Sequence, residues 1–296
     1  MNYLKLYIIL FFPICIFSKT GFPGFSAFTS SIQLSLGGAG FLNSSPISSS
    51  INPSSYIGEL FSFSLIRYPA SITSQSAGVV MPFLKGTGNI SVNNISYGTF
   101  QGYNENAESI GTYNSNDFWL TTSYAKSSVK HPIRLGFSSS IYSSSYNNHR
   151  MNILTFSIGS QINLKQYKVK LGLTIQEIGK SFGSLNTNFS PQIILSGSKQ
   201  LAHLPLQIYL DVSPGLKNVE NINLGGVFDI NKFFQIYIGS SMNKIKQNIN
   251  HNLFTTITGA TGIGFRYIHK SFSIHYSIFT YGTGAIIHGI EFGSSI

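Results

Sequence analysis

Residues able to act as acids, bases or nucleophiles are few in this chain, and their spacing forms no catalytic group. The nine acids include one close pair, Glu105 and Glu108, in a polar segment that is typical of a solvated loop. A general acid and a general base must both reach the reacting atoms of a bound substrate, and a solvated loop does not position them in that way. We therefore expect both side chains to be exposed to solvent.

The histidines and serines lead to the same interpretation. None of the seven histidines stands two or four residues from another, the spacing that would aim two imidazoles at one metal ion. Serine is abundant, but no G-x-S-x-G nucleophile elbow occurs. His275 and His288 are expected to form hydrogen bonds inside the protein. We predict no catalytic residue, no metal site and no cofactor, so the chain is not expected to be an enzyme.

The composition around these residues favours a chain that crosses a membrane as strands. Charged residues make up 9% of the 296 residues, against roughly 25% in soluble domains. A lipid-facing belt excludes Lys and Arg, which cost roughly 2–4 kcal/mol each at the bilayer midplane. The net charge of +10 comes from basic residues scattered in ones and twos. We therefore expect contacts with membrane lipid headgroups and none with nucleic acid.

The N-terminus has the three parts of an export signal. Lys5 supplies a positive charge, an apolar run extends from Leu6 to Phe17, and Ser18 is a small residue at which a signal peptidase would cut. The apolar run is too short to span a bilayer as a helix. We predict a signal peptide over 1–18. The single cysteine, Cys15, lies inside it, so the mature chain would contain neither disulfides nor thiolate sites.

Repeated alternation of apolar and polar residues predicts the fold. In 206–213, for example, every second residue is Leu, Ile or Val, and the residues between them are mostly polar. Such a period of two is typical of a strand with one apolar and one polar face. Fourteen segments show it, at about 60–69, 74–83, 87–97, 117–127, 133–143, 151–164, 167–177, 191–200, 204–213, 221–231, 233–243, 254–268, 271–281 and 284–296.

An even number of strands is expected for a bacterial single-chain barrel. We predict an all-β fold, a transmembrane antiparallel β-barrel of about fourteen strands over 58–296, in the bacterial outer membrane. Six charged residues fall on the polar face of these segments and are expected in the lumen, where pairs of opposite charge would fix the N-terminal segment. They are Asp211, Asp229, Arg134, Lys168, Lys170 and Arg266.

Residues 19–57, called the N-terminal segment below, differ in kind from the strands. They are rich in Gly, Ser and Pro and show little alternation. A connection of this length is either disordered or folds back into the barrel, and a barrel lumen of this size conducts water unless something fills it. We predict that the segment is a plug.

Two motifs of the N-terminal segment carry a family resemblance. One contains Gly37, Gly38, Ala39 and Gly40, and the other contains Asn52 and Pro53. Together they resemble the plug signature of the fatty-acid-transporter-like (FadL-like) barrel superfamily. Glycine lets a backbone pass closely through a barrel, and Asn-Pro starts a turn.

A narrower resemblance lies farther along the chain. The segments 95–100 and 111–118 are similar to a pattern of the PorQ family of type IX secretion outer-membrane proteins, as is 201–206. The residues that carry it are Tyr97, Gly98, Phe100, Gly111, Tyr113 and Asp117. The resemblance implies a non-enzymatic component that helps to export or attach cargo proteins at the cell surface. Its implied partners are a PorV-like barrel, a PorU-like sortase and a PorZ-like surface protein, and we predict that the polar loop 98–116 faces them.

Three alternatives stay open from the sequence. A FadL-like transporter of hydrophobic small molecules would need an apolar pocket beneath the plug with a lateral opening. A general porin would have an open lumen that conducts ions. An outer-membrane hydrolase would need a Ser/His/Asp set that converges at the lipid-facing edge.

Overall fold

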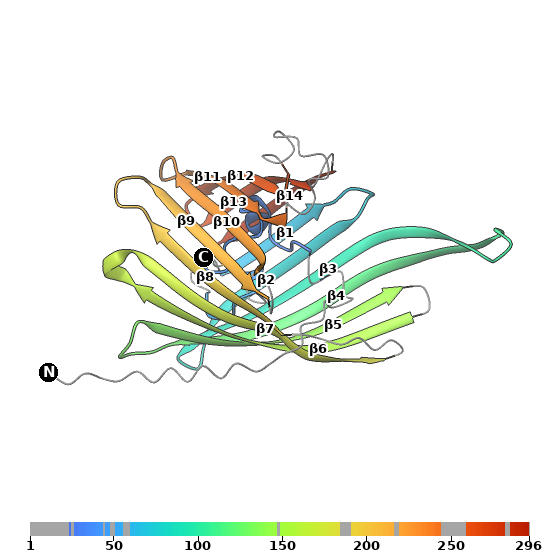
Figure 1. The fold of residues 1–296 in the computed structure, drawn as a ribbon, viewed down its shortest axis with the longest axis horizontal. Helices are drawn as coiled ribbons and strands as arrows, with labels where there is room; N and C mark the ends of the chain where they lie inside the picture. The colour runs from blue at the N-terminus through green and yellow to red at the C-terminus, as the bar shows by residue number, and fades with distance from the viewer. Residues whose placement is uncertain are drawn as a thin grey trace.

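Fourteen strands close into a single barrel (Figure 1). The computed structural model describes residues 24, 27–43, 45–47, 51–55, 60–146, 149–183, 191–215, 219–243, 259–281 and 285–295. The signal peptide predicted over 1–18 lies outside these residues. Each strand pairs antiparallel with its neighbours in sequence, and the first strand closes the barrel by pairing with the last.

The strands match the fourteen segments predicted from alternation, which confirms the all-β, antiparallel barrel. They are β1 Phe61–Arg67, β2 Thr73–Phe83, β3 Gly86–Tyr103, β4 Ser109–Ser127, β5 Ile133–Tyr146, β6 His149–Leu164, β7 Val169–Gly183, β8 Gln192–Gln200, β9 Leu206–Pro214, β10 Val219–Asp229, β11 Phe234–Ser241, β12 Thr261–His269, β13 Phe272–Tyr281 and β14 Ala285–Ser294. A short helix, α1 (Ser31–Ser35), precedes them, and a 3₁₀ turn, η3 (Lys165–Tyr167), joins β6 to β7.

The two faces of the barrel wall differ as alternation requires. In β1, Phe61, Phe63 and Leu65 point outward and are exposed, while Ser62 and Ser64 point inward and are buried. The same outward apolar side chains recur on the other strands. Soluble monomers rarely expose apolar patches larger than a few hundred Å², so this surface fits a lipid environment. Among the described residues, no helix is long and apolar enough to cross a membrane.

The connections differ between the two ends of the barrel. Turns of two residues, at 84–85 and 270–271, lie at the end where β1 begins and β14 finishes. At the opposite end, β3 and β4 extend far beyond the other strands as a hairpin (Figure 1). The prediction of a polar loop at 98–116 is therefore wrong, because only 104–108 form the turn. Beyond the lipid both faces of a strand contact water, so the alternation that marks membrane strands fades there.

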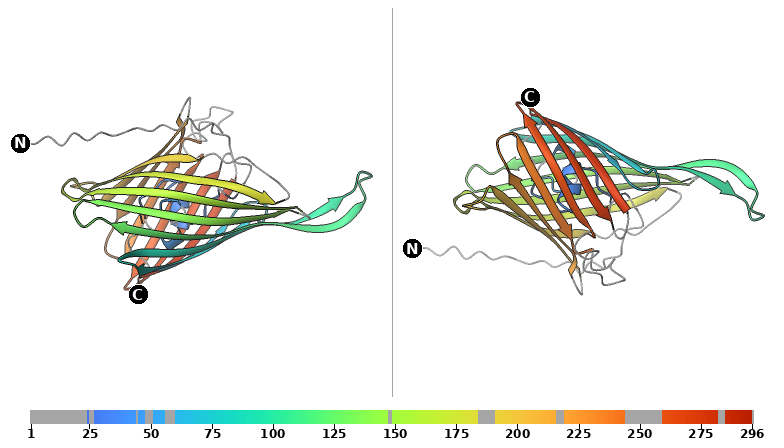
Figure 2. Two further views of the ribbon diagram at one scale, coloured as in Figure 1. Left: turned by 90° about the horizontal axis from the view of Figure 1, so that it is seen from below. Right: turned by 90° about the horizontal axis from the view of Figure 1, so that it is seen from above.

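The N-terminal segment lies inside the barrel. Helix α1 packs against the inner faces of β11, β12, β13 and β14. Figure 2 shows the helix, in blue, enclosed by the strands when the barrel is seen from two sides. The interior is therefore occupied by chain that comes before the first strand.

We predict that a charge on the outward face destabilises the protein only within the lipid belt. Ile158, on β6, is exposed on that face, and Val129 is exposed in a turn. Ile158→Arg is expected to lower the free energy of unfolding in lipid vesicles by about 2–4 kcal/mol, because the guanidinium meets hydrocarbon. Val129→Arg, the control, should change it by about 1 kcal/mol or less. Equal losses in urea titrations of the two variants would contradict a belt at this position.

Candidate functional site

Glu291 on β14 holds the N-terminal segment against the barrel wall. The hydroxyl of Ser30 donates to Oε2 of Glu291 at 2.6 Å, and the hydroxyl of Ser45 donates to Oε1 at 2.8 Å. The backbone N–H of Ile32 donates to Oε2 at 3.3 Å. Glu291 is only 2% exposed. A carboxylate removed from water depends on such donors, so the contact fixes the start of α1 at this point of the wall.

Asp211 on β9 holds the segment at a second point. Its Oδ2 accepts hydrogen bonds from the backbone N–H groups of Gly40, at 2.6 Å, and Phe41, at 3.2 Å. Nearby, the side-chain amide of Asn223 donates to the carbonyl oxygen of Gly38 at 3.1 Å. The φ angles of Gly38 and Gly40 are 87° and 99°, which L side chains rarely adopt. The glycine motif thus makes the turn that presents these amides to the wall.

Glycines of the wall leave room for the N-terminal segment. A Cβ atom on Gly239 would clash with the backbone of Leu36, and one on Gly136 would clash with the backbone of Pro53. A Cβ on Gly159 would strike the side chain of Asn52. Both predicted motifs of the segment therefore lie directly on the wall, with no side chain between them and the strands.

An apolar pocket lies between the N-terminal segment and the wall near the end of the barrel with the long hairpin. Its volume is about 230 Å³, and it is lined by Ala27, Phe28, Tyr68, Pro69, Ile72, Ile95, Tyr97, Tyr281, Ala285 and Ile287. The hydroxyl of Tyr68 accepts from the Phe28 N–H at 2.8 Å and donates to the Phe28 carbonyl at 3.1 Å. Burial raises the pKa of Tyr68, which follows the end of β1, so this hydroxyl stays neutral.

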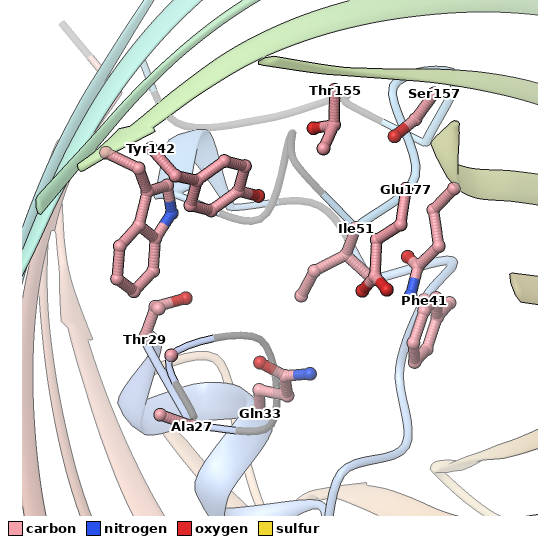
Figure 3. A pocket seen from close by; sticks show the side chains of 12 residues that line it. Ala27, Thr29, Gln33, Phe41, Ile51, Tyr142, Thr155, Ser157 and Glu177 are labelled. Atoms are coloured by element: carbon pink, nitrogen blue, oxygen red, sulfur yellow. The ribbon is translucent and has the colours of Figure 1, made fainter. Parts of the chain in front are cut away.

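A second, more polar cavity of about 90 Å³ lies beside the apolar pocket (Figure 3). Its lining comes from the N-terminal segment and from β4, β5, β6 and β7, and comprises Gly24, Ala27, Thr29, Gln33, Phe41, Ile51, Trp119, Tyr142, Thr155, Ser157, Gln176 and Glu177. Trp119 and Tyr142 stack with ring centroids 5.5 Å apart. Ala27 lines both spaces. No group of three or more His, Cys, Asp and Glu among the described residues is placed to hold a metal ion.

The six predicted lumen charges are placed in different ways. Asp211, Asp229, Arg134, Lys170 and Arg266 lie on the inward side of their strands. Lys168 does not, because it adopts a left-handed conformation at the end of η3 and is exposed in the turn.

The contacts described for these charges differ from the predicted ion pairs. Asp211 binds backbone amides of the N-terminal segment, and Asp229 accepts a hydrogen bond from Gln235 at 2.7 Å. Arg266 donates to the Ser273 hydroxyl at 3.0 Å. Paired charges that fix the N-terminal segment stay a prediction.

The residues predicted to face partners separate into two groups. Phe100, Gly111 and Tyr113 belong to the extended part of the β3–β4 hairpin, and the rings of Phe100 and Tyr113 stack at 5.5 Å. Asp117 is 1% exposed and points into the barrel, where it accepts a hydrogen bond from the Tyr97 hydroxyl at 2.7 Å. These two side chains are therefore part of the interior. Gly98 lies at the bulge between the two groups.

Three interior residues, His275, Glu291 and Glu177, do not belong to the site residues predicted from the sequence. His275 is buried, as expected, with its Nε2 3.1 Å from the Ser35 hydroxyl. His288, expected inside as well, faces outward and contacts the Tyr276 hydroxyl. Glu291 could have been found by alternation, since Phe292 next to it belongs to the apolar face. Glu177 could not, because an irregularity of β7 sets its direction.

No family model and no curated protein matches the sequence. Solved structures match by fold. The P. putida toluene transporter TodX aligns with a TM-score of 0.58 and 10% identity, over 90% of this chain and 98% of that chain. A TodX deltaS2S3 mutant, described as a monoaromatic hydrocarbon channel, aligns with a TM-score of 0.53 and 11% identity, over 90% and 99%. The Acinetobacter baumannii outer membrane protein Omp33 gives a TM-score of 0.45 and 8% identity, over 81% and 99%.

The fold is that of the outer-membrane β-barrels, in agreement with the predicted location and with contact between the wall and lipid. Within that class, the chain resembles TodX at low identity. This likeness is one of fold, and the FadL-like resemblance seen in the sequence stays a prediction. The narrower resemblance to the PorQ family stays a prediction.

We predict that a side chain at Gly239 displaces the N-terminal segment without opening the barrel. Gly239→Ala places a Cβ against the Leu36 backbone, and overpacking of this kind costs about 1–3 kcal/mol. Protection of the N-terminal segment from protease should therefore fall about 5- to 150-fold. In the control, Gly197→Ala, no atom lies closer than 4.0 Å to the new Cβ. If both variants keep full protection of the N-terminal segment from protease, and both barrels stay heat-resistant on gels, the prediction is contradicted.

Proposed function

We propose that this protein lets small hydrophobic molecules pass the outer membrane. The observation that carries the proposal is the apolar pocket between Phe28 of the N-terminal segment and the wall. Three tyrosines line it, and two of them, Tyr68 and Tyr97, direct their hydroxyls to hydrogen-bond partners, the Phe28 carbonyl and Asp117. A space of this kind attracts an apolar solute, since water gains few hydrogen bonds there.

The size of the pocket favours a molecule with about one ring. An apolar cavity of about 150 Å³ holds benzene, and this pocket measures about 230 Å³. Sites for drug-sized ligands begin at about 300 Å³. TodX, which the fold resembles, is described as a toluene transporter and as a monoaromatic hydrocarbon channel. A toluene-sized hydrocarbon therefore fits both the pocket and the structural likeness.

A general porin fits these observations less well. A porin conducts ions through a water-filled lumen. Here the described part of the N-terminal segment occupies the interior and is bound to Glu291 on β14 and to Asp211 on β9. An apolar pocket beside this segment suits selective passage of apolar solutes rather than free diffusion of ions.

We predict that filling the pocket blocks passage. Ala285→Trp places an indole in the apolar pocket, while Ala77→Trp, the matched control, adds the same ring on the outward side of β2. Uptake of radiolabelled toluene by proteoliposomes should fall at least tenfold in the first variant and stay within about twofold of the parent in the second. Equal uptake by the two variants, with both barrels folded, would exclude the pocket from the route.

A second candidate function follows from the β3–β4 hairpin. Its aromatic face carries Phe100, Tyr113 and, from β5, Tyr146, with successive ring centroids 5.5 and 5.2 Å apart. Tyr103 and Ile110 near the tip are 62% and 66% exposed. Aromatic side chains held rigidly outside a barrel suit protein contacts. This surface supports a role as a type IX secretion component that binds PorV-like, PorU-like or PorZ-like proteins.

We predict that partner binding, where it occurs, depends on this aromatic face. Phe100→Ala with Tyr113→Ala removes two of its rings. Thr99→Ala with Asn114→Ala removes only the 2.7 Å hydrogen bond on the other face of the same hairpin. Pull-downs from gently solubilised outer membranes should recover a sortase-like protein with the parent and the control, and at least fivefold less with the aromatic double variant. Recovery of the protein alone in all three samples would contradict this second candidate function.

A further inference from the structure

Glu177 reaches the barrel interior because β7 is irregular at this point. The pairing of β6 and β7 shifts register between Phe156 and Ile158, and Glu177 on the facing strand has a φ of 63°. In a regular strand, consecutive side chains point to opposite faces. Here Gln176 and Glu177 both line the polar cavity. A bulge commonly re-aims a side chain toward a functional site.

One oxygen of the Glu177 carboxylate, Oε2, has no hydrogen-bond partner in the part of the chain that the structure describes. Glu177 is 6% exposed. Its carboxylate points into the cavity (Figure 3). No Lys, Arg or His occurs among the described residues that line this space. A buried carboxylate without a partner is strongly unfavourable when it is ionised, so a cation received by the cavity would stabilise it.

The other three buried acids in the described part of the chain show that this state is exceptional. Glu291 and Asp211 bind donors of the N-terminal segment, and Asp117 binds the Tyr97 hydroxyl. The fold thus provides donors where a carboxylate has a structural role. At Glu177 the described residues line a cavity instead.

The opposite wall of the cavity is aromatic. Trp119 and Tyr142 are 3% and 6% exposed, and their rings stack at an interplanar angle of 29°. Gln33, Thr29 and Thr155 add neutral polar groups. Aromatic faces attract organic cations through their π electrons. A hard metal ion would instead require several oxygen ligands, and this lining offers one carboxylate.

We propose that the polar cavity binds a small organic ammonium ion. The Glu177 carboxylate neutralises the charge, the Trp119 and Tyr142 rings contact the carbon-bearing side, and the neutral polar side chains accept any N–H groups. The site differs from the apolar pocket in chemistry and in lining, so it stands whether or not that pocket conducts hydrocarbons.

The chain carries its own reporter for this site. Trp119 is the only tryptophan in the sequence, so the intrinsic emission of the folded protein reports on the cavity. The probe is methylammonium chloride, a cation small enough for a cavity of about 90 Å³, added to the full chain in lipid nanodiscs. One control is methanol, which has a similar size without the charge, and the other is sodium chloride at equal ionic strength.

Methylammonium should give a saturable change in Trp119 emission that neither control produces. Glu177→Gln should weaken binding at least tenfold, while Glu108→Gln, in an exposed turn, should leave it unchanged. Tyr142→Leu keeps the carboxylate and removes a ring, so it should weaken binding about three- to tenfold and serves where Glu177→Gln fails to fold. No response to methylammonium, an equal response to the neutral alcohol, or full binding by either cavity variant would overturn the proposal.

Discussion

The architecture of this protein depends on the satisfaction of polar groups on the inner face of its wall. An antiparallel barrel satisfies its own backbone, but inward carboxylates such as Glu291 and Asp211 are removed from water once the lumen is filled. A buried acceptor without a donor costs about 1–3 kcal/mol, and more when it is charged. The N-terminal segment supplies those donors from Ser30, Ser45 and the backbone N–H of Gly40. Its position therefore follows from the placement of two acids on the strands.

The shape of the two spaces in the lumen follows from that docking. Wall glycines let the segment touch the strands at Leu36 and Pro53, and α1 packs on β11 to β14. The segment therefore touches the wall at β5 as well as at β11 to β14, and the two spaces lie in the lumen beside it. The apolar space is bounded by β3, β13, β14 and the connection between β1 and β2, and the polar space by β4, β5, β6 and β7. One segment thus produces two neighbouring sites of opposite chemistry, which meet at Ala27.

The sequence predicts the fold well and the site in part, for reasons that particular residues make plain. Lipid on one face and a polar lumen on the other impose a period of two, so all fourteen strands are visible in the pattern. The pattern fails at 98–116, where both faces meet water, and at Lys168, where a left-handed residue ends the alternation. The glycine motif was found, but its partner, Asp211, was expected to bind a basic side chain. Backbone amides have no signature in a sequence, so such a contact escapes any analysis of residue types.

Glu177 shows most clearly how function departs from the rules that build the barrel. Alternation would place either Gln176 or Glu177 against lipid, and an ionised carboxylate there would be costly. The irregularity of β7 avoids this by turning both side chains inward, although a left-handed conformation is itself unfavourable for glutamate. A regular strand with a neutral residue at 177 would avoid both costs. No described hydrogen bond to Oε2 of Glu177 offsets these costs, which supports the proposal that the gain comes from a cation bound in the cavity.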